Sequence, residues 1–464
     1  MSIGFPPPVS HIAEAIRARG GRALVVGGWV RDRLLGRLSK DVDLEVFGLD
    51  AGALREVLEQ FGSVNAVGES FTVYKVGDID IALPRRDSKT GTGHRGFTVV
   101  GDPSMSMAEA ARRRDFTINA IAIDPATGDY IDPWGGIPDL ERRVLRAVDP
   151  QTFGDDSLRV LRAVQFAARF ELTLDPATRE LCRTIPLNDL PAERVWGEIE
   201  KLLLQAHRPS IGFSLALELG VIDRLFPELH ALVGCPQEPE WHPEGDVWIH
   251  TLMVIDQARR RIDDLDHPRK VTVMLGAVCH DVGKPPTTAV IDGRIRSMEH
   301  EQAGVAPATA LLDRLNVHSI AGFDVRAQVL GIVAHHLKPL AFFKSATPVG
   351  DGAFRRLAQK VDLELLARVA ESDCLGRAGR FDCSGIEWFL ARARELGVEH
   401  EAPPPLLKGR HLLDLGMAPG PEMGRILRQV YERQLDGSVT SVEQGIEAAR
   451  GILSAPADSS SGPR

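Results

Sequence analysis

The chain has 464 residues, of which 44% are hydrophobic and 26% are charged, and its formal net charge is −9. This composition is ordinary for a globular protein of roughly two to four domains. The acidic balance excludes a protein coated in basic surface, although it is compatible with a local basic groove that binds nucleic acid.

Targeting and redox features are sparse. No apolar run of about 18 residues occurs, so we expect no membrane-spanning helix, and residues 1–8 are too short and too proline-rich for a signal peptide. The cysteines are odd in number and form no CxxC pair, so we expect reduced thiols and a cytoplasmic protein. They are Cys182, Cys235, Cys279, Cys374 and Cys383.

The first part of the chain, residues 1–147, is predicted to be an α/β domain with a small mixed sheet and few helices. DVDLEVFG (41–48) alternates charged and apolar residues, which is the period of a strand. Residues 86–98 have no apolar period and are predicted to form a mobile loop. The other expected elements are helices over 11–20, 29–36 and 52–61 and strands over 23–26, 72–76 and 78–83.

Strands become scarce beyond about residue 150, and the rest of the chain is predicted to be all-α. Amphipathic stretches cover 155–170, 192–206 and 210–224. Stretches rich in proline at 235–246 and 402–405 predict linkers, and the tail PADSSSGPR predicts disorder. The expected domains are 1–147, 148–234, 235–400 and 401–464.

A glycine pair lies between the predicted strand and the helix that follows it. Gly27 and Gly28 allow the backbone to turn sharply and to approach a ligand closely. The helix behind them offers free N–H groups and a positive dipole end, and Arg31 adds a cation one turn further on. This pattern suits a phosphate, although many such turns are only structural.

Two carboxylates follow on the next predicted strand. Asp41 and Asp43 lie at positions i and i+2, so they point to the same face. Such a pair suits Mg²⁺, which takes carboxylate and phosphate oxygens together. Asp80, on a later strand, is the candidate for a third carboxylate in metal-assisted phosphoryl transfer.

With these residues in place, the chain resembles the family that holds bacterial tRNA CCA-adding nucleotidyltransferases and poly(A) polymerases. The resemblance covers roughly residues 20–230 and follows five motifs in order. The motifs are GGWVRDRLLGRLSKDVDLEVFG (27–48), RRRDFTINAIAID (112–124), IDPWGGIPDLERRVLR (131–146), FGDDSLRVLRAVQFAARF (153–170) and AERVWGEIEKLL (192–203).

The resemblance implies a role for particular side chains. Asp41 and Asp43 would bind the catalytic Mg²⁺, and Gly28 and Arg31 would hold the triphosphate. Arg114 would recognise the incoming nucleotide, and Asp115 would reach its ribose.

The fourth motif would read the incoming base. Asp156 and Arg159 are spaced i, i+3 on the expected helix, so they share a face. A carboxylate accepts from the exocyclic amine of C or A, and a guanidinium donates to a ring nitrogen or carbonyl. Gly27, Arg162 and Gln165 belong to the same implied nucleotide-binding set. This chain departs from the family at two positions. The family usually has Arg where this chain has Gln165, and Glu where this chain has Asp155.

The implied reaction is attack of an RNA 3′-hydroxyl on the α-phosphate of CTP or ATP, with release of pyrophosphate. The implied product is CCA at the 3′ end of tRNA. A poly(A) polymerase and an enzyme that adds only A are the alternatives within the family. A hydrolase with a degenerate nucleotide-sensing domain is the alternative from another class.

The helical region after residue 235 resembles the HD phosphohydrolase superfamily through the run HDVGK (280–284). Four N/O ligands from several helices suit a divalent ion such as Mg²⁺, Mn²⁺ or Ni²⁺, and Lys284 is a candidate phosphate contact. The resemblance implies removal of 2′,3′-cyclic or terminal phosphates from RNA; the alternative is a domain that only extends the tRNA-binding arm. The expected ligands are His250, His280, Asp281 and Asp373, with His300, His335 and His336 as candidates for a second metal.

The segment 406–441 also resembles a C-terminal piece of the transferase family. The sequence from Gly416 to Gly420 is typical of a turn between helices. Such a turn can meet an RNA backbone, or it can serve packing alone.

Overall fold

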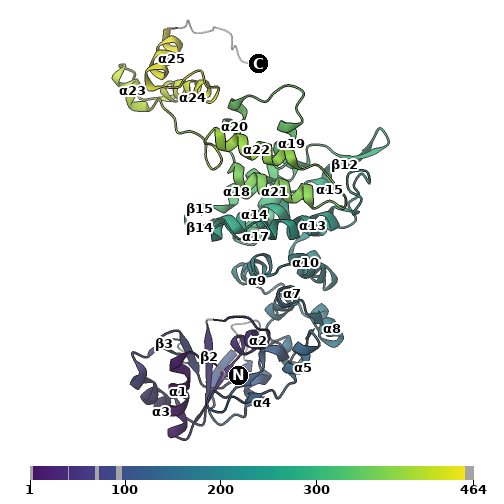
Figure 1. The fold of residues 1–464 in the computed structure, drawn as a ribbon, viewed down its shortest axis with the longest axis vertical. Coiled ribbons are helices and arrows are strands. Elements are labelled where there is room, and N and C mark those ends of the chain that lie inside the picture. Colours follow the sequence, from purple (N-terminus) through teal and green to yellow (C-terminus); the bar gives the residue numbers. More distant parts are fainter. Residues whose placement is uncertain (1–3, 40, 68–72, 90–96, 455–464) are drawn as a thin grey trace. The chain divides into compact units, whose positions relative to one another are not determined.

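A computed structural model describes residues 4–39, 41–67, 73–89 and 97–454 (Figure 1). The chain divides into two compact units, Met1–Leu225 and Phe226–Arg464. The first unit begins with a mixed sheet and the second is mostly helical, which confirms the expected fold class. The finer division into four domains stays a prediction.

The strands of the first unit form a seven-stranded sheet in the order β3-β4-β5-β2-β1-β8-β9, with one further hairpin, β6-β7, and a short β10-β11 pair. Its strands are β1 (Arg22–Val26), β2 (Val42–Phe47), β3 (Asn65–Val67), β4 (Val73–Val76), β5 (Ile79–Ala82), β6 (Arg85–Lys89), β7 (Phe97–Gly101), β8 (Ala122–Ile123), β9 (Tyr130–Ile131), β10 (Val144–Leu145) and β11 (Thr173–Leu174). Its helices are α1 (Pro7–Ala18), α2 (Gly28–Leu34), α3 (Ala51–Leu58), α4 (Met107–Arg112), α5 (Gly136–Glu141), α6 (Pro150–Phe153), α7 (Leu158–Phe170), α8 (Pro176–Thr184), α9 (Ala192–Gln205), α10 (Pro209–Glu218) and α11 (Val221–Leu225), with short 3₁₀ turns at Glu59–Phe61 and Thr117–Asn119.

The register of the central strands brings the predicted site residues together. β1 runs antiparallel to β2 and pairs Val26 with Asp43. β2 runs parallel to β5 and pairs Asp43 with Asp80. The end of β1, where the glycine pair begins, therefore lies beside Asp43 on β2, and β5 with Asp80 follows on the far side of β2.

An apolar core holds these strands in place. β1 is buried on both faces, and Leu24 and Val26 pack with Phe47 and Ala122. Helix α1 packs against β1 and contacts α3, as Figure 1 shows beside the strands. Burial on both faces explains why β1 is a continuous apolar run.

The hairpin β6–β7 corrects one expectation. Residues 85–89 and 97–101 pair as antiparallel strands, where the sequence predicted a loop over 86–98. Strand pairing satisfies backbone hydrogen-bonding groups whatever the side-chain pattern. The absence of an apolar period in this segment therefore gave no sign of the hairpin. Residues 90–96, and the tail predicted to be disordered, lie outside the described residues.

An aromatic cluster packs helix α7 against the part of the first unit that contains the sheet. The ring of Phe116 lies 5.5 Å from that of Phe153 and 5.8 Å from that of Phe166. Helix α7 also packs against α9 and α10. These contacts hold the start of α7 near the residues that follow α4.

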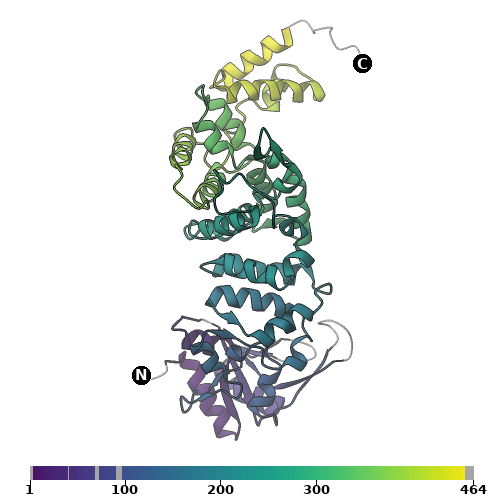
Figure 2. The same cartoon turned by 90° about the vertical axis from the view of Figure 1, so that its right-hand side faces the viewer.

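The second unit packs its helices around α14 and α21. Its helices are α12 (Pro227–His230), α13 (Val247–Arg259), α14 (His267–Cys279), α15 (Lys284–Thr287), α16 (His300–Ala303), α17 (Val305–Arg314), α18 (Val325–His335), α19 (Lys338–Phe343), α20 (Asp351–Ala358), α21 (Leu363–Leu375), α22 (Ser384–Glu395), α23 (Gly409–Asp414), α24 (Pro421–Leu435) and α25 (Val442–Ser454). Its strands form two hairpins, β12 (Thr288–Ile291) with β13 (Arg294–Ser297) and β14 (Ser319–Ile320) with β15 (Phe323–Asp324). The C-terminal helices, yellow in Figure 2, enclose a small core of their own.

Two cysteines of the second unit correct another expectation. Cys374 and Cys383 form a disulfide, with Cα atoms 6.0 Å apart, so the prediction of reduced thiols throughout is wrong. The loop after α21 turns back and brings together two residues whose spacing matches no motif. Cys182, Cys235 and Cys279 are free and buried. Among the described residues, no helix is both long and apolar enough to cross a membrane.

Gly283, in the HDVGK run, is packed too closely for any side chain. A Cβ there would lie 2.0 Å from the carbonyl oxygen of His300 and 2.5 Å from the backbone nitrogen of Gly304. Because both neighbours are backbone atoms, we expect Gly283→Ala to lower the free energy of unfolding by about 2 kcal/mol or more. Urea unfolding measures this.

The matched control is Gly451→Ala in α25, where nothing lies within 4 Å of the added Cβ. There the better helix propensity of Ala should leave stability equal or raise it by up to ~1 kcal/mol. Equal unfolding midpoints for Gly283→Ala and the unsubstituted chain would contradict the packing argument.

Candidate nucleotide pocket and metal centre

The first unit contains a pocket of about 380 Å³ between the sheet and the start of α7. Most of the residues predicted to bind nucleotide line it. They are Gly27, Gly28, Arg31, Asp43, Arg114, Asp115, Asp156, Arg159 and Arg162. The pocket also takes Asn119, Leu158 and Arg194, which the sequence did not single out.

The glycine turn allows the closest approach in this pocket. Gly27 has φ 74°, a conformation that favours glycine. A Cβ there would lie 3.0 Å from Nη1 of Arg114 and 3.7 Å from Oδ2 of Asp43. The turn therefore brings bare backbone, a guanidinium and a carboxylate together.

The carboxylates beside the turn differ in their surroundings. Asp43 lines the pocket, whereas Asp41 and Asp80 are not among its lining residues. Asp80 is 3.3 Å from Nζ of Lys75. Burial raises the pKa of Asp43, and the neighbouring Asp80 and Asp41 add to this despite Arg114. This local excess of negative charge fits a divalent cation.

Two arginines of the pocket are held by internal partners. Arg31 donates to Asp32 at 2.7 and 2.9 Å and to Oδ1 of Asn119 at 2.7 Å. Arg162 pairs with Oδ2 of Asp115 at 2.6 Å, and Asn119 donates to Oδ1 of the same carboxylate at 2.9 Å. Asn119 thus couples both arginines, and it lies within the second motif, which offered no reason to choose it.

The predicted base readers line the pocket, but they do not share one helix. Asp156 lies in the turn before α7 and accepts from Arg194 at 2.9 Å. Arg159, in the first turn of α7, donates to the backbone carbonyl of Thr152 at 2.8 Å. Arg194 therefore orients Asp156, and the carbonyl of Thr152 orients Arg159. Although they are three residues apart, Asp156 and Arg159 do not form an ion pair on the surface of a helix.

Gln165 lies away from the pocket. It is 1% exposed, it is not among the lining residues, and neither polar atom of its side-chain amide has a hydrogen-bond partner among the described residues. It lies about one turn further along α7 than Arg162, at a buried position.

The second unit contains a buried cluster of imidazoles and carboxylates from several helices. His250 lies in α13, His280 and Asp281 follow α14, and Asp373 lies near the end of α21. Nε2 of His250 is 3.0 Å from Oδ1 of Asp373, and Nε2 of His280 is 3.1 Å from Oδ2 of Asp281. All four expected HD ligands therefore converge.

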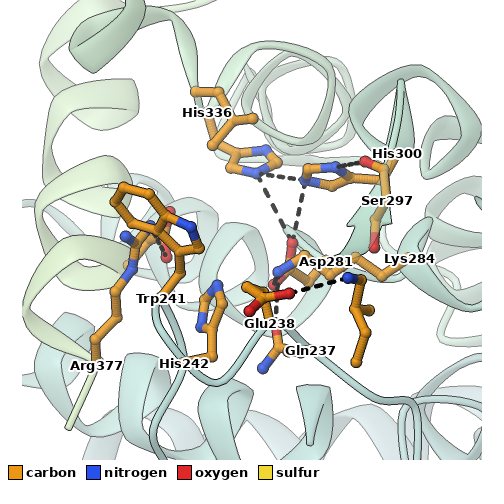
Figure 3. Close-up of a pocket in the computed structure, with 13 residues that line it drawn as sticks. Gln237, Glu238, Trp241, His242, Asp281, Lys284, Ser297, His300, His336 and Arg377 are labelled. Atoms are coloured by element: carbon orange, nitrogen blue, oxygen red, sulfur yellow. Dashed lines mark hydrogen bonds and ion pairs between the residues drawn. The ribbon is translucent and has the colours of Figure 1, made fainter. Parts of the chain in front are cut away.

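The cluster extends to two more histidines (Figure 3). Oδ1 of Asp281 is 3.3 Å from Nε2 of His300 and 3.9 Å from Nε2 of His336. His335, the other candidate, is outside this group, because successive residues at the end of α18 point in different directions. Among the described residues, the groups able to offer three metal ligands are centred on His250 and Asp281.

Hydrogen bonds at the opposite ring nitrogen orient each imidazole. Nδ1 of His280, His300 and His336 lies 2.8 to 2.9 Å from the carbonyl oxygen three residues earlier. Each Nδ1 therefore carries the proton, and each Nε2 lone pair faces the cluster. Nε2 of His300 and Nε2 of His336 are 3.3 Å apart, within hydrogen-bond distance, and both would face a cation bound beside Asp281.

The charges of the cluster also fit a cation. Burial opposes ionisation of Asp281, but His280 and Lys284 lower its pKa well below the ordinary value. Burial lowers the pKa of His336 to about 4, and His280 adds to this. The carboxylate is thus ionised and His336 neutral at pH 7, which are the states that bind a metal.

The segment 235–246, expected to be a linker, contributes to the site. Oε1 of Glu244 is 2.8 Å from Nδ1 of His250 and 2.9 Å from Nδ1 of His242. Glu244 thus orients His250 from outside the cluster. No sequence motif marks it, because its role depends on the chain folding back over α13.

A pocket of about 280 Å³ opens above the cluster. Lys284 lines it, with Nζ 2.8 Å from Oδ2 of Asp281 and 2.7 Å from Oε1 of Gln237. Arg377 lines the opposite side, 3.8 Å from Oδ1 of Asp373 (Figure 3). Two cations thus border a site whose floor suits metal ions.

Models of known protein families match the regions of the chain that contain the two sites. The family model described as Poly A polymerase head domain matches residues 23–146, the one described as probable RNA and SrmB-binding site of polymerase A matches 171–233, and the one described as HD domain matches 247–373. The multifunctional CCA protein of Xanthomonas campestris is 38% identical over 371 residues, covering 76% of this chain and 85% of that protein.

This chain belongs to the multifunctional CCA protein family. A Stenotrophomonas maltophilia relative with the same name is 42% identical over 305 residues, covering 63% of this chain and 71% of its own length. Both the nucleotidyltransferase and the HD families are metal-dependent, and the buried ligand groups of the second unit accord with that.

Solved structures share the fold at low identity. The Bacillus stearothermophilus CCA-adding enzyme in complex with CTP aligns with a TM-score of 0.63 at 21% identity, covering 97% of this chain and 99% of that one. The Thermotoga maritima CCA-adding enzyme complexed with tRNA aligns with a TM-score of 0.59 at 20% identity, covering 97% and 96%.

Metal binding in the second unit is directly measurable. Saturating Mn²⁺ or Ni²⁺ should raise the melting temperature of chelator-treated protein, because a ligand at 100 times its Kd adds about 2.7 kcal/mol of stability. His336→Ala should show a smaller rise, since it removes one inward-facing lone pair. His318→Ala, an exposed histidine of the same unit, is the control. A full rise in His336→Ala would remove His336 from the ligand set.

Proposed function

We propose that this protein adds C and A nucleotides to the 3′ ends of tRNA from CTP and ATP. The observation that carries this proposal is the convergence of the glycine turn, Asp43, the Asp115–Arg162 pair and the Asp156–Arg159 pair on one pocket. The names of the relatives and the solved structures with CTP and tRNA support the choice of substrates.

The pocket suggests a division of labour along the nucleotide. The N–H groups at the start of α2 and Arg31 bind the triphosphate, while Asp115 binds the ribose. Mg²⁺ held by Asp41 and Asp43 would neutralise phosphate charge and lower the pKa of the attacking 3′-hydroxyl. Arg114, half-buried and 3.5 Å from Oε2 of Glu45, lies beside the glycine turn and thus close to the proposed position of the phosphates. Asp80 is the neighbouring carboxylate for proton transfer, although its ion pair with Lys75 competes with that role.

Base selection is assigned to Asp156 and Arg159. The carboxylate accepts from the amine that C and A share, whereas U and G present a carbonyl at that position. Arg194 and the backbone carbonyl of Thr152 hold the two readers in fixed positions. Protein side chains thereby replace a nucleic-acid template. Gln165 acts through the packing of α7, since it does not line the pocket.

The second unit carries a second proposed activity, hydrolysis of 2′,3′-cyclic or terminal phosphates on RNA. The observation that favours it is Asp281, whose Oδ2 faces His280 while its Oδ1 faces His300. His250, His280, Asp281 and Asp373, with His300 and His336, would hold divalent ions there, and such ions would polarise a phosphate ester and activate water for its hydrolysis. Mn²⁺, Ni²⁺ and Mg²⁺ are the candidate ions.

Asp43→Asn should abolish nucleotide incorporation into tRNA that lacks its CCA end. We expect a loss of at least about 10³-fold in rate, comparable to removal of one preorganised charge in other active sites. The measurement is incorporation of labelled CTP and ATP, with sequencing of the product ends to separate CCA addition from A addition alone.

The control is Asp78→Asn, an exposed carboxylate between β4 and β5, which should keep full activity. Asp43→Asn should keep the proposed phosphate hydrolysis by the second unit while it loses nucleotide transfer. Normal incorporation by Asp43→Asn would refute the proposed catalytic site, and long A tails would favour the poly(A) alternative.

Asp156→Ala should relax base selection. The substitution removes the acceptor for the exocyclic amine, so discrimination of CTP over UTP should fall by about 10- to 100-fold, equivalent to one lost hydrogen bond to a charged group. Competition between labelled CTP and UTP measures the ratio of kcat/KM. An unchanged ratio with reduced overall activity would assign Asp156 a structural role.

A further inference from the structure

The pocket above the histidine cluster has an outer wall that neither proposed activity explains. This wall is the segment 237–242, and it ends in Trp241 and His242, which both line the pocket. The metal-ligand cluster forms the floor, as Figure 3 shows for Asp281, His300 and His336. This wall is therefore available to the organic part of a phosphate ester bound at the floor.

The wall is held at several points. Backbone nitrogens of Trp241 and His242 donate to the carbonyl of Glu238 at 3.0 and 2.9 Å. Oε2 of Glu238 accepts from the backbone of Ile295 at 2.9 Å, which ties the wall to β13. Gln237 accepts from Lys284 at 2.7 Å. The backbone beneath Trp241 is thus fixed at both the hairpin and the cluster.

The indole of Trp241 nevertheless remains 47% exposed. A single exposed aromatic residue is common on protein surfaces, so exposure alone carries no argument. Here Trp241 lines a pocket whose floor suits phosphate chemistry, and Arg377 lines the same pocket. An exposed aromatic ring in a pocket that also holds a cation is an arrangement that stacks on nucleobases without regard to sequence.

We propose that Trp241 is a base-stacking platform that makes the HD site selective for nucleoside phosphates over phosphate esters without a base. This inference rests on the proposed hydrolytic function of the same site. The terminal base of an unpaired RNA 3′ end would stack on the indole, while its 2′,3′-phosphate lies over Asp281 between Lys284 and Arg377. Because stacking accepts any base, the site discriminates by the presence of a base and not by its identity.

The test compares two cyclic phosphodiesters that share the reacting group. Adenosine 2′,3′-cyclic phosphate has a base, and glycerol 1,2-cyclic phosphate has none. In metal-loaded full-length protein, Trp241→Ala should lower kcat/KM for the adenosine substrate about tenfold, through KM, and leave the glycerol substrate unchanged. Trp241→Phe should retain most of the activity on the adenosine substrate.

Glu240→Ala is the matched control, because it removes the 3.1 Å ion pair to Arg294 in the same segment but keeps the ring. It should leave the ratio between the two substrates unchanged. An equal loss on both substrates in Trp241→Ala, or an unchanged ratio, would overturn the proposal.

A binding measurement separates this inference from the hydrolytic proposal. Calorimetry with adenosine 3′-monophosphate, which lacks the 5′-triphosphate expected in the transferase pocket, should show about tenfold weaker binding to Trp241→Ala. Weaker binding with no hydrolysis by the unsubstituted protein would retain the platform and refute the hydrolase. Equal binding by both proteins would refute the platform.

Discussion

The antiparallel pairing of β1 with β2 is the constraint on which the transferase site depends. It sets Val26 opposite Asp43, so the chain that leaves β1 at Gly27 turns directly over a carboxylate. A shift of one residue in this register would move the carboxylate to the opposite face of the sheet. The pairing of β1 with β8 on its other edge also fixes the position of β1 in the sheet.

Charged side chains in the pocket form ion pairs and are not isolated. Asp115 is buried, and Arg162 pairs with its Oδ2 while Asn119 donates to its Oδ1. Burial opposes its ionisation, but the charge of Arg162 and the hydrogen bond from Asn119 lower its pKa. Buried charges of this kind persist only when they are paired and hydrogen-bonded. The same pairing keeps side chains at fixed positions around the space that a nucleotide would occupy.

In the histidine cluster, backbone carbonyls and one carboxylate hold the side chains at fixed positions. Each ring is oriented by a backbone carbonyl or by Glu244, so that acceptor nitrogens accumulate around Asp281. A metal ion bound by these groups would add to the stability of the second unit. The disulfide between Cys374 and Cys383 closes the loop that follows Asp373.

The sequence by itself determined the α/β order followed by helices and the glycine turn, and it picked out the pocket carboxylate Asp43 and the histidines and aspartates that meet in the second unit, because local period and motif spacing encode them. Only the tertiary structure decided that Asn119, Arg194 and Glu244 join the sites, that Gln165 and His335 stand apart, and that two cysteines pair. Those outcomes depend on contacts between residues far apart in the chain. The local sequence pattern does not predict such contacts, because they depend on how the helices and strands pack together and on the direction of the backbone between them.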